Sequence, residues 1–100
     1  MPRRKLPEPK RLPLERLLSS AGKTRLLLSI AQYREITISK LIRLSRMNFR
    51  EASRFIDFLK RIGLVEERRY GRVRIISIKQ RLFFDKLNEL SEIWESLQKT

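Results

Sequence analysis

The sequence predicts a mainly α-helical α+β fold in which a β-hairpin follows two short helices. Three features of residues 36–78 support this fold class. Apolar residues recur at helical spacing in two neighbouring runs, Gly63 closes the second run, and strand-like runs flank Tyr70-Gly71. A chain of 100 residues is expected to form one small domain with an added arm and an added helix.

The N-terminal segment differs from the rest of the chain in its proline content. Residues 1–13 contain all four prolines and five basic residues. Because proline at this density prevents a helix, we expect a flexible basic arm. Residues 14–78 are then expected to form the main domain, and residues 79–100 a C-terminal helix.

Two helical runs are expected before the helix pair and the hairpin. The first begins after the last proline and has leucines on one side. The second covers residues 23–33 and places Leu27, Ile30 and Ala31 on one face, which is typical of a core helix. The β-branched residues 36–37 are expected to form a short strand that pairs with the hairpin.

The helix pair is expected over about residues 38–45 and 48–62, joined by a tight turn. Asn48 suits the cap of the second helix, and Glu51 is placed to reach back to it in a variant of the capping box. The apolar residues expected to face the core are Leu41, Ile42 and Leu44 in the first helix and Ala52, Phe55, Ile56, Leu59 and Ile62 in the second.

The hairpin is expected over residues 64–78. Gly63 suits the left-handed position that ends a helix, and Gly71 suits the turn between the two strands. In the second strand, alternate residues share a face, which would place Arg72 and Arg74 on the same side.

The C-terminal segment, residues 79–100, is expected to be a dimerisation helix. A lone helix of about 20 residues is unstable in water, so its apolar seam must pack on something. A second copy of the same helix is the expected partner, which makes the protein a homodimer; the alternative is packing on the first helix of its own chain. The seam repeats at spacings of 4, 3, 4 and 3, as in a coiled coil, and consists of Phe83, Leu87, Leu90, Trp94 and Leu97.

The charge of the chain predicts a polyanionic partner. Lysine and arginine number 24 against 11 aspartate and glutamate, a net charge of +13. Residues 19–78 hold 14 basic and 5 acidic side chains, whereas residues 79–100 hold four of each. Because the excess lies on the helix pair and the hairpin rather than on one long amphipathic helix, it favours DNA over a membrane surface. We therefore expect a cytoplasmic, nucleoid-associated protein with no membrane partner.

Enzyme chemistry and metal binding are not expected. The chain has no histidine and no cysteine, which excludes the usual zinc and thiolate sites. The run 21–24 resembles the end of a phosphate-binding loop, but Leu17 stands where that motif needs its first glycine. No cofactor is therefore expected. Few Asn and Gln beside abundant Lys, Arg and Glu are typical of a thermophile.

The second helix of the pair carries the residues expected to read DNA. Outside its apolar stripe it leaves Phe49, Arg50, Ser53 and Arg54, and its first two turns would enter the major groove. Arg50 and Arg54 share one face, so either is placed to contact a guanine edge. The alternative is a solvated face in which Arg54 pairs with nearby carboxylates. Asn48 is expected to cap the helix rather than to read adenine.

Further basic residues are expected to contact phosphates or a narrow minor groove. The alternative for the hairpin is protection of an edge strand against aggregation. The N-terminal arm is either a frayed end or a further minor-groove element. The expected contacts are Lys40 and Arg43 before the turn, and Arg68, Arg69, Tyr70, Arg72 and Arg74 on the hairpin.

Residues 17–78 resemble the winged helix-turn-helix superfamily. The likeness is carried by residues 23–28, 37–41 and 58–66, and the last of these resembles the stretch leading into the wing of MarR-, ArsR- and PadR-type regulators. With the C-terminal helix the chain is similar to small archaeal and PadR-like dimers. The resemblance implies dimeric binding of duplex DNA, and most members are transcriptional repressors. Unlike the sensor members, this chain has no cysteine, and no separate ligand domain is expected.

Three functions follow from these expectations. The first is a homodimeric regulator of transcription whose recognition helices lie about 34 Å apart in successive major grooves. The second is a partition-site or architectural protein that spreads along DNA and recruits a second protein. The third is a protein-interaction module that never reads bases. A bounded footprint favours the first, and a footprint that grows with protein concentration favours the second.

Overall fold

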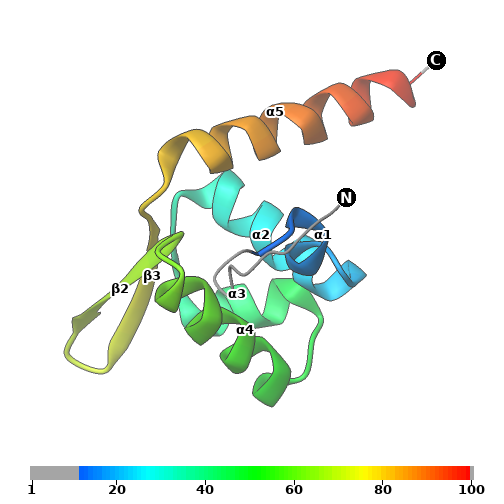
Figure 1. Ribbon diagram of the computed structural model, residues 1–100. Coiled ribbons are helices and arrows are strands. Elements are labelled where there is room, and N and C mark those ends of the chain that lie inside the picture. Colours follow the sequence, from blue (N-terminus) through cyan, green and yellow to red (C-terminus); the bar gives the residue numbers. More distant parts are fainter. Residues whose placement is uncertain (1–11, 100) are drawn as a thin grey trace.

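A computed structural model describes residues 12–99, which form helices packed beside a small antiparallel sheet (Figure 1). The element order expected from the sequence is confirmed, whereas most of the predicted arm, residues 1–11, lies outside the described residues. The helices are α1 (Leu14–Leu17), α2 (Ala21–Tyr33), α3 (Ile38–Ser45), α4 (Phe49–Arg61) and α5 (Arg81–Leu97). The strands are β1 (Glu35–Thr37), β2 (Val65–Tyr70) and β3 (Val73–Ile78).

Helix α2 is the centre of the core. It contacts α3, α4, α5 and the sheet, and Leu26, Leu27 and Ile30 on it are fully buried. It starts two residues earlier than expected because the Ser20 side chain caps it, accepting from the backbone N–H of Lys23 at 3.1 Å. The run that resembled a phosphate-binding loop is therefore the first turn of a helix.

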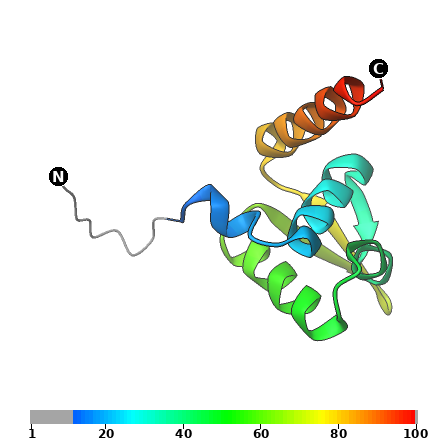
Figure 2. The ribbon, with the colours of Figure 1, turned by 90° about the vertical axis from the view of Figure 1, so that its right-hand side faces the viewer.

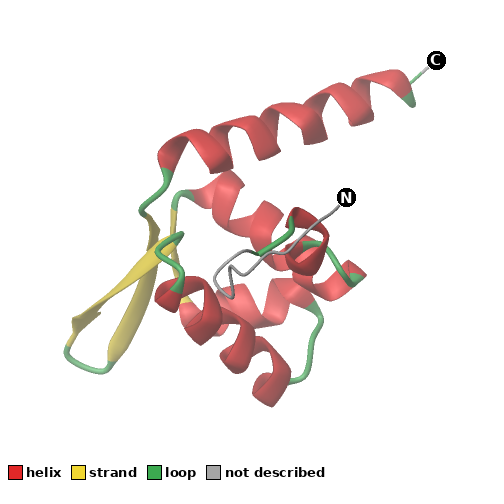
Figure 3. Cartoon of the chain, viewed as in Figure 1, coloured by secondary structure: helices red, strands yellow, loops and turns green. Residues whose placement is uncertain are grey.

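The sheet joins the hairpin to the helical body in the strand order β1-β3-β2 (Figure 3). Strand β1 pairs with β3, with Ile36 opposite Ile76, so the predicted stub strand is confirmed. Tyr70 pairs with Val73, which leaves a two-residue turn in which Gly71 has a φ of +61°. Alternation along the second strand predicted that Arg72 would lie in that strand, on the same side as Arg74. Arg72 lies instead in the turn, at the tip of the hairpin.

Helix α4 ends at Arg61, one residue before the predicted end, and Ile62 after it is less buried than expected. Gly63 adopts a φ of +83°, and the N–H groups of Gly63 and Leu64 donate to the carbonyls of Lys60 and Leu59. This is a Schellman motif, which stops the helix and starts the chain toward β2. Ile62 is the C-terminal cap and is 40% exposed, so its expected place in the buried stripe is wrong.

The apolar seam expected on α5 divides into two parts. Its N-terminal half packs on the protein's own core: Phe83 and Leu87 are half-buried against the core, and Phe84 beside them is fully buried. Phe83 and Leu87 therefore have an intrachain partner as well, and the expectation that all five seam residues serve a dimer stays a prediction. Beyond that point α5 diverges from α2 (Figure 1) and leaves its remaining seam residues exposed, namely Leu90, Trp94 and Leu97.

Candidate nucleic-acid interface

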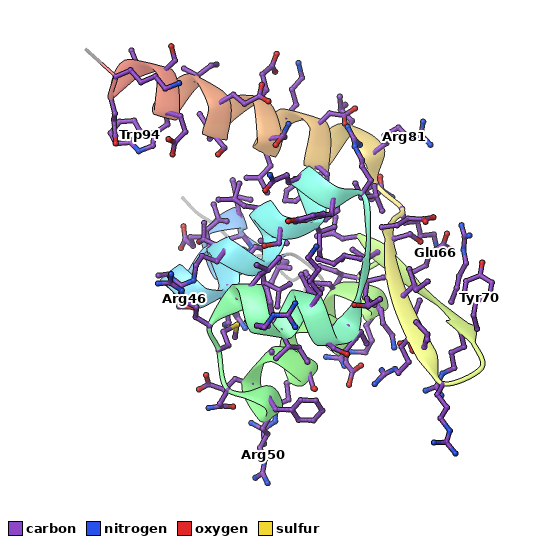
Figure 4. All side chains as sticks on the ribbon, turned by 180° about the vertical axis from the view of Figure 1, so that it is seen from behind. Arg46, Arg50, Glu66, Tyr70, Arg81 and Trp94 are labelled. Carbon is purple, nitrogen blue, oxygen red and sulfur yellow. The ribbon has the colours of Figure 1, made fainter. Side chains whose placement is uncertain are left out.

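The start of α4 and the tip of the β2–β3 hairpin lie on the same side of the molecule. Figures 1 and 2 show both on the side opposite α5, in views that differ by a quarter turn. Figure 4 shows Arg50 pointing outward from this side, while Arg81 and Trp94 on α5 lie at the other. The two elements expected to meet DNA are therefore presented together.

The turn between α3 and α4 is held by buried polar contacts. The Ser45 hydroxyl donates to the carbonyl of Ile42 at 2.7 Å and accepts from the N–H of Met47 at 3.1 Å. Arg25 of α2 donates through Nε to the Ser45 carbonyl at 2.9 Å. Arg46 follows in the left-handed conformation, with a φ of +61°. These bonds give the polar groups of the turn hydrogen-bond partners within the protein, and they fix the direction in which α4 leaves the turn.

The first turn of α4 is capped as the sequence predicted. The Asn48 side-chain oxygen accepts from the backbone N–H of Glu51 at 2.8 Å. The reciprocal bond of a capping box, from Asn48 N–H to the Glu51 carboxylate, is not among the hydrogen bonds of residues 12–99. Because its oxygen is already engaged, Asn48 acts as a helix cap.

The exposed face of α4 presents cations without acidic partners. Arg50 and Arg54 are both exposed, and Phe49 beside them is 66% exposed, whereas Ser53 is half-buried. In the described part of the chain no carboxylate lies within 4.0 Å of either guanidinium. The alternative in which Arg54 pairs with a neighbouring carboxylate is thus not adopted; Asp57 instead lies 3.5 Å from Lys60.

The wing contains one carboxylate that gathers several cations. The Glu67 side chain is only 9% exposed and accepts from Arg74 at 2.6 and 3.1 Å and from Lys60 of α4 at 2.7 Å. Arg69 lies 3.5 Å away. Hydrogen bonds from Arg74, then from Lys60, lower the pKa of Glu67 from 4.5 to about 2. This cluster ties the wing to the last turn of α4 and occupies Arg74.

The remaining arginines of the wing differ in their partners. Arg68 lies 3.9 Å from Glu35, a long and exposed pair. Arg72, in the turn, has no carboxylate within 4.0 Å among residues 12–99, and Tyr70 beside it is 59% exposed (Figure 4). Arg72 is therefore the wing cation most available to an external anion.

The two expected cations of α3 also differ. The ammonium of Lys40 lies 4.3 Å from the centre of the Tyr33 ring, a cation–π contact that leaves it half-buried. Arg43 is exposed, and no carboxylate of the described residues lies within 4.0 Å of its guanidinium. Arg43 and Arg46 thus extend the set of unpaired cations from α4 back to the turn.

Sequence reasoning missed three residues of this region. Arg46 was predicted only as part of a tight turn, although its position two residues before the Asn48 cap is visible in the sequence. Lys60 and Glu67 were missed because they are seven residues apart on a helix and a strand. No local spacing rule predicts that they meet across the Schellman turn.

Within residues 12–99, no group of three or more Asp and Glu side chains is arranged to hold a metal ion. No helix in this part of the chain has the length and apolar character needed to cross a membrane.

No protein-family model and no curated protein matches the chain. Solved structures do resemble it. The transcriptional repressor BigR from Xylella fastidiosa superposes with a TM-score of 0.67 at 20% identity, over 80% of this chain and 81% of BigR. The MarR family regulator SPO1453 from Silicibacter pomeroyi gives 0.67 at 22% identity, over 83% of this chain but only 62% of that protein.

A third structure has a similar fold and a size close to that of this chain. It is the homodimeric winged helix-turn-helix DNA-binding domain of Mb0332 from Mycobacterium bovis, a possible ArsR-family regulator. Its TM-score is 0.65 at 23% identity, over 82% of this chain and 75% of that domain. The chain therefore has a winged helix-turn-helix fold, in which α3 and α4 form the helix pair and β2 and β3 form the wing.

Proposed function

We propose that this protein is a transcriptional regulator that binds duplex DNA as a homodimer through α4 and the wing. The observation that carries the proposal is the set of exposed arginines without acidic partners on the start of α4 and at the wing tip, two elements that lie on one side of the molecule (Figures 1 and 2). Guanidinium groups held on a rigid helix and a rigid ribbon suit phosphates and guanine edges. The similar structures described as transcriptional regulators support the same function.

In the proposed complex α4 lies in the major groove. Arg50 and Arg54 stand on one face of its first two turns, so one of them contacts a guanine O6/N7 edge or both contact the flanking phosphates. Phe49 is exposed beside them and offers an apolar contact to a thymine methyl group. Ser53 is half-buried and offers a short-range hydrogen bond at the groove edge.

The wing is proposed to contact phosphates or a narrow minor groove through Arg72, with Arg68 and Tyr70 beside it. Arg74 and Arg69 are proposed to contribute less, because Glu67 already engages them. Arg43 is proposed to contact the DNA backbone from α3. Lys40 would have to leave the Tyr33 ring to contribute.

The dimer is proposed to form through the exposed part of α5. Leu90 is 62% exposed and Trp94 is 58% exposed, and Leu97 follows them at coiled-coil spacing. Exposed apolar side chains in one row are rarely left uncovered in a soluble domain, and a second copy of the helix offers a matching row. In such a dimer the two α4 helices are expected about 34 Å apart. With DNA as partner, the proposed place of action is the cytoplasm, at the nucleoid.

The experiment that tests this function is a footprint on genomic fragments selected by the purified protein. The expected result is one bounded, two-fold symmetric footprint that disappears in the Arg50→Ala/Arg54→Ala variant. A matched control, Lys86→Ala/Lys99→Ala, removes the same charge from α5 and the turn that follows it, and is expected to keep the footprint. A footprint that lengthens with protein concentration would instead favour the architectural alternative, and unchanged binding by the Arg50/Arg54 variant would refute the proposed interface.

A further inference from the structure

A second polar site lies at the base of the wing, away from the start of α4 and from the wing tip. A groove of about 500 Å³ opens between the end of α2, the sheet and the start of α5. Arg34, Arg68 and Arg81 line it, together with Glu35 and Asp85. Figure 4 places Arg81, at the start of α5, far from Arg50. The volume of the groove lies within the range of small-molecule sites.

A buried hydroxyl without a partner lies in the lining of this groove. Ser77 of β3 is only 4% exposed, and its Oγ makes no hydrogen bond within residues 12–99. A buried hydroxyl left unpaired is costly, and most such groups in proteins have a partner. The Oγ atom itself has less than 1 Å² of exposed surface, so a ligand oxygen in the groove accepts from it once a lining side chain that covers it moves aside.

The start of α5 supplies a second set of free donors at the same groove. The Gln80 side chain forms no capping hydrogen bond, and the first turn has no acidic residue. The N–H groups of this turn are therefore not capped from within the described residues, and Arg81, the first residue of the turn, lines the groove, so the positive end of the helix dipole lies near it. This combination favours an anion.

The charges of the groove are available to a ligand. Three guanidinium groups face two carboxylates, so the groove carries one net positive charge. Arg34 donates to Asp85 at 2.6 Å, and Arg68 lies 3.9 Å from Glu35, but all four side chains are about half exposed. Such solvent-exposed pairs are weak and can rearrange. Arg81 has no carboxylate within 4.0 Å among the described residues.

We propose that this groove binds a small phosphate-bearing metabolite. The phosphate oxygens accept from Ser77 Oγ, from the Arg81 guanidinium and from the first N–H groups of α5. Arg34 and Arg68 neutralise the rest of its charge. The site shares Arg68 with the proposed wing contacts but uses none of the residues proposed to contact the major groove, so it can exist whether or not the protein regulates transcription.

The test is calorimetric titration of the full chain with inorganic phosphate and with pyrophosphate, at constant ionic strength set by chloride. Saturable binding of one anion per chain is expected. Ser77→Ala and Arg81→Gln should each weaken the affinity at least tenfold. The matched control Arg50→Gln removes one charge from the other side and should change it less than twofold.

A second measurement on the unmodified protein guards against variants that fail to fold. Amide NMR shifts induced by phosphate should be largest at residues 77 and 81–83. The proposal is overturned if phosphate does not saturate, if Arg50→Gln weakens binding as much as Arg81→Gln, or if either Ser77→Ala or Arg81→Gln leaves the affinity unchanged. It is also overturned if these amides respond to duplex DNA and not to phosphate, because a DNA backbone phosphate is then the occupant.

Discussion

Replacing Glu67 by glutamine should destabilise the protein in a way that depends on pH. A carboxyl whose pKa falls from 4.5 to about 2 on folding contributes about 3 kcal/mol to the free energy of unfolding at neutral pH. The partners Arg74 and Lys60 are 35% and 32% exposed, so water screens part of this energy. We therefore expect Glu67→Gln to lower the free energy of unfolding by about 2 kcal/mol at pH 7.

The sign of the pH dependence follows from the lowered pKa. The contribution of Glu67 is fully present above pH 4.5 and is lost as the pH falls toward about 2, where the folded carboxylate takes up its proton. Urea unfolding followed by circular dichroism should therefore give a difference between wild type and Glu67→Gln that is large at pH 7 and small near pH 2. The difference in the free energy of unfolding between the two proteins should therefore shrink between pH 4.5 and about 2, and not at higher pH.

Glu66 provides a matched control for this measurement. It precedes Glu67 on β2 and is exposed, and no cation within residues 12–99 lies within 4.0 Å of its carboxylate. Glu66→Gln should change the free energy of unfolding by no more than about 0.5 kcal/mol. If Glu67→Gln were as mild as Glu66→Gln at pH 7, or if its effect did not vary with pH, the cluster would not stabilise the wing.

Three further predictions concern the turn, the cap and the dimer. Asn48→Ala should lower stability by about 1 kcal/mol in thermal unfolding, while Asn48→Asp should retain it; equal loss in both would contradict a capping role. Gly71→Val should destabilise by at least about 1 kcal/mol, because its φ is +61°, and Gly71→Asn should be tolerated better. Leu90→Glu/Trp94→Glu should convert a dimer to a monomer in analytical ultracentrifugation, and a dimer that survives would remove α5 from the interface.

The fold was predictable because its signals are local. The cap at Asn48, the glycines at the end of α4 and in the hairpin turn, and the apolar spacing within each helix all act over fewer than five residues. Even the short strand β1 was expected, because two adjacent β-branched residues between helices favour a strand. Ile62 was misplaced because the exact last turn of a helix depends on the cap that follows it.

The location of the candidate site was predictable, but the ion pairs that its arginines form were not. The arginines of α4 and of the wing were visible in the sequence, but the capture of Arg74 by Glu67 was not. That cluster depends on the angle at which the wing leaves α4, which is set by the whole core. The division of the α5 seam into a packed half and an exposed half also depends on the tertiary fold. Phe83 and Leu87 pack on the core because the fold brings the first half of α5 against α2.

The most direct test of the account is the salt dependence of duplex DNA binding by wild type and by Arg50→Ala/Arg54→Ala/Arg72→Ala. Wild-type affinity should fall steeply as salt rises, because phosphate contacts release counterions. The triple variant should bind at least about 100-fold more weakly, with a shallower slope of log affinity against log salt. A triple variant that kept both the affinity and the slope of wild type would contradict the claim that these arginines meet the DNA.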